Sequence, residues 1–251
     1  MLKFLRRIRR KLIADGNLKR YLPYAIGEII LVVIGIFIAI QLNNWNENRK
    51  LDNQLNTTLE QLKSNLELDY YRLDSLHTVY STWYNQSQII IDSVLGGKVE
   101  KVNTLELYDV GNGSMHYLSI NRTTYNELAN SGKYTNLLNS EIGSKIYEYF
   151  EYAETELTKV NLDNNNMVDY FEKEMDLAEN SRYFRLLNQR NLEYIDWTWL
   201  KNPKSDEYKI LENRISYFQL AILANQKVIK NLNSRASVLI NELETMLSSK
   251  I

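Results

Sequence analysis

The chain has 251 residues, 44% of them hydrophobic and 24% charged, and a formal net charge of -1, which suits one domain plus an anchor and argues against nucleic-acid binding. Only 9 Gly and 2 Pro occur, so long helices are favoured over a strand-rich fold with many turns. The absence of Cys excludes disulfides and thiolate chemistry, and the 2 His argue against a His-rich metal site, so we expect no cofactor.

Residues 1–22 are predicted to form a basic amphipathic tail. Apolar residues recur in it at helical spacing, which is typical of a helix lying on a leaflet of anionic lipids. Nucleic-acid binding is the alternative, but the tail carries no motif that supports it. We therefore expect lipid headgroups to contact the basic side chains of Arg6, Arg7, Arg9, Arg10 and Lys11.

Residues 23–43 are predicted to be a transmembrane helix. Residues 24–42 read YAIGEIILVVIGIFIAIQL, and as a helix they would rise about 28 Å, close to the thickness of the hydrocarbon core. Pro23 suits the first helical turn. The positive charges precede the apolar run, which places the N-terminus in the cytoplasm and residues 44–251 outside. A cleaved signal peptide is disfavoured, because the run is long and no small-residue cleavage site follows Gln41.

Two features of the span suggest contacts inside the membrane. Gly27, Gly35 and Ala39 fall on one helix face, where small residues allow a second helix to approach closely, although such residues are also common in spans. Glu28 is an ionisable group about one turn inside the cytoplasmic end. We interpret Glu28 as reaching the headgroups or a nearby basic residue, with a partner-helix contact or a proton relay as the alternative.

Residues 44–251 are predicted to form a helical domain outside the membrane. Apolar or tolerant positions alternate by four and three over residues 51–94, which predicts a helix of roughly 45 to 50 residues that can run straight out of the membrane. Gly96 and Gly97 are expected to end it. Residues 98–120 read as a loop with at most a short ordered element.

A short helix and a second long helix are expected to follow. Thr124 and Glu127 match a capping box, and the short helix closes at residues 131–132. Ser140 can cap the long helix. This helix either continues beyond residue 166 or kinks or breaks at the polar run of residues 163–166. Its apolar stripe consists of Ile142, Ile146, Phe150, Ala153, Leu157 and Val160.

The last helix has the clearest pattern. An irregular region precedes it and contains Tyr194, Trp197 and Trp199, which either pack at the end of the domain or line a pocket. Ser205 is the predicted N-cap, and apolar positions alternate by three and four over residues 208–246. The fold class is therefore all-α, an antiparallel bundle of three long helices plus one or two short ones. An intermolecular coiled coil is the alternative use of the same stripes.

Two stretches carry a resemblance to a known family. The span continues into NNWNE, and a second stretch includes Tyr125, Leu128, Ser131, Gly132, Lys133, Leu137, Leu138, Asn139, Glu141, Ile146, Tyr149 and Phe150. With its signature YAIGEIxLVVIGIxIAxxxNNWNE, the chain resembles an uncharacterised family of single-span envelope proteins common in Bacteroidota. The resemblance covers most of the chain. It implies a bacterial inner-membrane anchor with a helical periplasmic domain, and it implies no activity.

The sequence motifs and the helix faces bear on function. No P-loop, G-x-S-x-G, H-E-x-x-H or dinucleotide motif occurs, and the carboxylates at residues 148–156 have the spacing of a solvated helix face, so no enzyme is expected. The leading hypothesis is a scaffold that binds copies of itself or another envelope protein. The alternatives are a ligand-sensing domain that signals through a partner, and a subunit of a proton-driven complex in which Glu28 relays protons.

Overall fold

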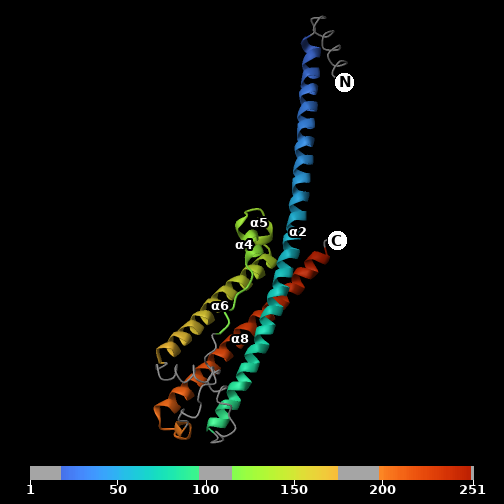
Figure 1. Cartoon of the computed structure of the whole chain (residues 1–251). Coiled ribbons are helices and arrows are strands. Elements are labelled where there is room, and N and C mark those ends of the chain that lie inside the picture. The colour runs from blue at the N-terminus through green and yellow to red at the C-terminus, as the bar shows by residue number, and fades with distance from the viewer. Residues whose placement is uncertain (1–17, 96–114, 175–197, 250–251) are drawn as a thin grey trace, which may run out of the picture. The chain divides into compact units, whose positions relative to one another are not determined.

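The computed structural model describes residues 18–95, 115–174 and 198–249. No strand occurs among these residues, which confirms the all-α prediction. Figure 1 shows the order of the elements along the chain. They are α2 (Leu18–Leu95), α4 (Thr123–Asn130), α5 (Thr135–Leu138), α6 (Glu141–Glu174), the 3-10 helix η3 (Thr198–Lys201) and α8 (Asp206–Ser248).

The chain divides into two compact units, residues 1–57 and residues 58–251. In the first unit, α2 carries the apolar run, and the described residues bury none of its most apolar stretch. This is the one helix among the described residues that is long and apolar enough to cross a membrane, as the predicted anchor requires. Because α2 begins at Leu18, Pro23 lies beyond the first helical turn in which it was expected.

In the second unit, the remainder of α2 buries most of the predicted stripe. Helix α2 extends to Leu95, and the glycines predicted to stop it, Gly96 and Gly97, lie outside the described residues. Asp69 is a buried polar member of the stripe, and burial raises the pKa of its carboxyl group. The buried members are Thr58, Leu62, Asp69, Leu73, Tyr80, Ser87 and Ile90.

The capping box predicted for α4 is wrong. The N-cap position is Arg122, with no side-chain cap hydrogen bond, and Thr124 lies inside the helix. The Thr124 hydroxyl is buried and instead accepts a hydrogen bond from Asn65 Nδ2 of α2 at 2.8 Å, so packing against α2 decides where the helix begins. The predicted end is confirmed, because Ser131 is the C-cap and Gly132 follows with a φ of +66°.

Helix α6 begins as predicted and continues without a break through the polar run to Glu174. Ser140 Oγ accepts a hydrogen bond from the Gly143 N–H at 3.3 Å. Within the polar run, Asn164 is buried and exchanges side-chain amide hydrogen bonds of 3.2 and 2.9 Å with Asn225 of α8. Because both amides have partners, the polar residue is accommodated inside the core.

Helix α8 starts at its predicted cap and buries its predicted stripe. Ser205 Oγ accepts a hydrogen bond from the Tyr208 N–H at 3.3 Å. The buried residues of α8 include Leu211, Ile215, Phe218, Ile222, Ile229, Leu232, Ala236, Leu239 and Leu243.

Side-chain contacts pair α8 in antiparallel order with α6 and with the second-unit part of α2. Lys63 Nζ lies 3.5 Å from Glu244 Oε1, and further along the pair Gln226 Nε2 donates to Ser81 Oγ at 2.8 Å. Residue numbers therefore rise along α2 as they fall along α8. The register of this helix pair follows from these contacts.

An extended segment, residues 115–121, is held between α2 and α6 by side chains. Asn161 of α6 forms two hydrogen bonds with Leu118, because its Oδ1 accepts from the N–H at 2.9 Å and its Nδ2 donates to the carbonyl at 2.7 Å. Asp69 of α2 accepts from the Asn121 N–H at 2.7 Å, and Arg72 donates to the Ser119 carbonyl. The side chains supply the backbone partners that a sheet would otherwise provide.

Candidate interaction site between α6 and α8

Two polar contacts connect α6 and α8 about two helical turns apart. At the first, Lys145 Nζ of α6 lies 2.8 Å from Glu242 Oε1 of α8 and 2.9 Å from Glu141 Oε1. At the second, the Arg235 guanidinium of α8 lies over the Tyr152 ring of α6, with its carbon 3.9 Å from the ring centroid. The two contacts delimit a stretch of the interhelical surface that no polar contact bridges among the described residues.

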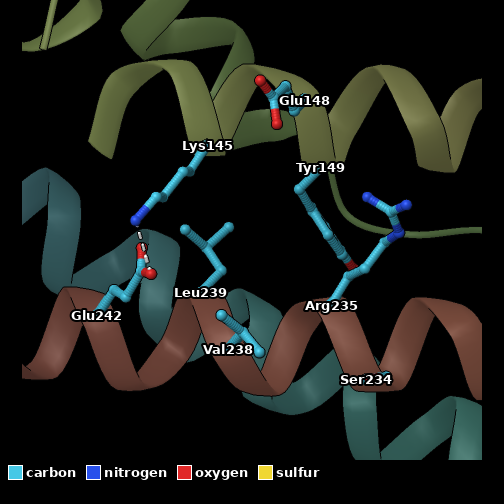
Figure 2. Close-up of a pocket in the computed structure, with 8 residues that line it drawn as sticks. All are labelled: Lys145, Glu148, Tyr149, Ser234, Arg235, Val238, Leu239 and Glu242. Atoms are coloured by element: carbon cyan, nitrogen blue, oxygen red, sulfur yellow. Dashed lines mark hydrogen bonds and ion pairs between the residues drawn. The ribbon is translucent and has the colours of Figure 1, made fainter. Parts of the chain in front are cut away.

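A pocket occupies this stretch, as Figure 2 shows. The buried Tyr149 and Leu239 contribute to its wall, whereas Val238 is 57% exposed. Its volume is about 260 Å³, below the roughly 300–1,000 Å³ of typical small-molecule sites, so it suits one protein side chain better. The eight residues that line this interhelical pocket are Lys145, Glu148, Tyr149, Ser234, Arg235, Val238, Leu239 and Glu242.

The charges at the interhelical pocket are compensated unevenly. Two carboxylates surround Lys145 and neutralise its charge. Arg235 and Glu148 make no ion pair with any residue that the structure describes. The ring of Tyr152 holds Arg235 from one side, which leaves its N–H donors for an external carboxylate.

Tyr149 carries a buried hydroxyl that has no hydrogen-bond partner among the described residues. Burial and the nearby negative charge of Asp69 raise its pKa. An unpaired buried hydroxyl costs about 1–3 kcal/mol. We therefore expect Tyr149→Phe to leave the free energy of unfolding unchanged or to raise it by about 1 kcal/mol, as measured by urea denaturation of the full chain in detergent.

Tyr147→Phe is the matched control for this substitution, because Tyr147 is 56% exposed on the same helix and should change stability little. A loss of more than about 1 kcal/mol on Tyr149→Phe alone would mean that the hydroxyl donates a hydrogen bond in solution.

No described element packs over the residues predicted to make contacts in the span. A Cβ built at Gly27 or Gly35 would meet nothing within 4 Å, Ala39 is exposed, and Glu28 is partly exposed. Trp199 lies half-buried in η3. Two sets of predicted site residues lie outside the described residues: the tail residues Arg6, Arg7, Arg9, Arg10 and Lys11, and the aromatic residues Tyr194 and Trp197.

The sequence patterns did not predict the interhelical pocket, because it forms between two helices that are far apart in the chain. Glu148 belongs to the run of carboxylates interpreted as a solvated face, and its exposure agrees with that interpretation. A usable signal was the seven-residue spacing of Lys145 and Tyr152 on one helix and of Arg235 and Glu242 on the other. Among the described residues, no group of three or more His, Cys, Asp or Glu side chains could hold a metal ion.

A model of a family of unknown function, DUF6090, matches residues 28–161. The chain belongs to this family. The DUF6090 region includes most of the apolar run, the extended segment, α4, α5 and the part of α6 that ends at Asn161. Helix α8, which supplies one side of the interhelical pocket, lies outside it. No curated protein and no solved structure matches the chain.

Proposed function

We propose that the protein is a membrane-anchored helical scaffold that binds copies of itself or another envelope protein. The observation that carries the proposal is the apolar run of α2, whose most apolar stretch no described residue buries. In this proposal a bacterial inner membrane covers it, with the basic tail in the cytoplasm and residues 44–251 in the periplasm. The resemblance to envelope proteins of Bacteroidota supports this location.

The periplasmic part is proposed to be a bundle of three long helices. The contacts of α8 with α2 and α6 support this arrangement, since each long helix buries its apolar stripe in the second unit. The interhelical pocket favours binding of a protein side chain over sensing of a metabolite, because its volume is small. A role in binding other proteins requires a binding surface such as the interhelical pocket and requires no catalytic groups.

The proposal is tested by purifying the tagged full-length protein from the inner-membrane fraction in mild detergent. We expect a complex heavier than one chain plus its micelle, with a stoichiometric partner or further copies identified by mass spectrometry. An untagged strain processed in parallel identifies proteins that bind the resin. Recovery of a single chain alone, or of the protein outside the membrane fraction, would contradict the proposal.

A further inference from the structure

The outer face of α2 in the second unit carries two large apolar side chains that are mostly exposed. Leu68 is 65% exposed and Tyr71 is 68% exposed, and the two lie one turn apart. Asp74 follows one turn later, exposed and without an ion pair among the described residues. We call Leu68, Tyr71 and Asp74 the outer α2 face.

The outer α2 face and the interhelical pocket lie at the same level along the helices. Lys63 is opposite Glu244, and Leu68 comes five residues after Lys63 as Leu239 comes five residues before Glu244. Leu68 is therefore level with Leu239 and the adjacent Val238. By the same register Asp74 is level with Asn233, which is two residues from Arg235. The long side chain of Arg235 can cover that difference in level.

The two surfaces cannot meet within one copy of the chain. Leu66, Asp69 and Leu73 are buried in the second unit, so the α2 face bearing Leu68 and Tyr71 is turned away from the core. The exposed residues of the interhelical pocket belong to α6 and α8, so the pocket opens on a surface other than the outer α2 face. Contact between the surfaces requires a second copy.

We propose that the outer α2 face of one copy docks into the interhelical pocket of the next, so that copies join head to tail. Leu68 and Tyr71 supply the apolar side chains, and Asp74 faces the uncompensated Arg235. The inference rests on the proposed membrane anchoring, which attaches all copies to the same membrane through the same segment and so agrees with the equal levels of the two surfaces. A head-to-tail contact uses two different surfaces, so it extends into rings or rows.

Cysteine crosslinking of the full-length protein in its membrane tests this contact, since the chain has no Cys. On oxidation, Leu68→Cys combined with Val238→Cys should give a ladder of dimers, trimers and larger species on a denaturing gel. Thr82→Cys with Val238→Cys is the matched control, because Thr82 is also exposed on α2 but lies about 21 Å further along the axis. Both variants change exposed side chains, so the fold is retained.

Charge reversal then tests the ion pair between copies. Arg235→Glu in the Leu68→Cys, Val238→Cys protein should reduce the ladder about five-fold, and adding Asp74→Lys should restore it. A ladder no stronger than the Thr82 control overturns the inference, and so does full dimer formation by Leu68→Cys alone, which indicates a two-fold contact. If the purified protein is multimeric but the ladder is absent, the scaffold proposal stands and only this contact fails.

Discussion

Gly143→Ala is expected to lower the free energy of unfolding by about 2–3 kcal/mol. Gly143 lies in the first turn of α6, where a Cβ would overlap the carbonyl oxygen of Leu137 and come within 2.8 Å of the Leu138 Cα. These are backbone atoms of α5 and cannot move aside as a flexible side chain can. The cost of overpacking outweighs the helix propensity of about 1 kcal/mol that Ala gains over Gly.

The measurement is thermal unfolding of the full chain in detergent, followed by circular dichroism. A loss of this size corresponds to about 4–12 °C in the midpoint for a unit of this length. Ser144→Ala is the control, because Ser144 is the exposed neighbour in the same turn. A Gly143→Ala protein that melts at or above the parent temperature would show that α5 does not approach α6 this closely.

Asn161→Ala is expected to cost about 2–4 kcal/mol. The substitution removes both hydrogen bonds that hold Leu118 and leaves a backbone N–H and a carbonyl unpaired beside a buried residue. Each such group costs about 1–3 kcal/mol. The extended segment should also loosen from α6, which hydrogen exchange at the Leu118 amide would report as reduced protection.

Two further variants separate the lost hydrogen bonds from the lost packing. Asn165→Ala removes an exposed amide on the same helix and should change stability by less than about 0.5 kcal/mol. Asn161→Asp keeps the shape and the acceptor for the Leu118 N–H but loses the donor to its carbonyl. If Asn161→Asp unfolds like the parent chain and protection at Leu118 is unchanged, the two-bond contact does not stabilise the segment.

The described part of the fold was predictable where a local pattern decides the structure. The stripe of α8, the caps at Ser205 and Ser140 and the stop at Gly132 are all confirmed. Each depends on residues within one or two turns of one another, so periodicity and capping chemistry are enough to identify them.

The failures occur where a distant residue competes with a local rule. Thr124 matches a capping box, but its hydroxyl bonds to Asn65 of α2 and the helix begins earlier. Asn164 belongs to a polar run that marked a potential break, but Asn225 of α8 satisfies its amide inside the core. In both positions, a hydrogen bond to another helix determines the local structure.

The sequence by itself determined the apolar run, the asymmetry of charge around it, the all-helical class and the membership of a family of unknown function. Only the tertiary structure decided that Asn161 holds the extended segment and that Gly143 contacts α5. It also decided that Lys145 and Arg235 border one pocket. The physical reason is that periodicity fixes which face of a helix is apolar, whereas pockets and side-chain bonds between helices depend on their register.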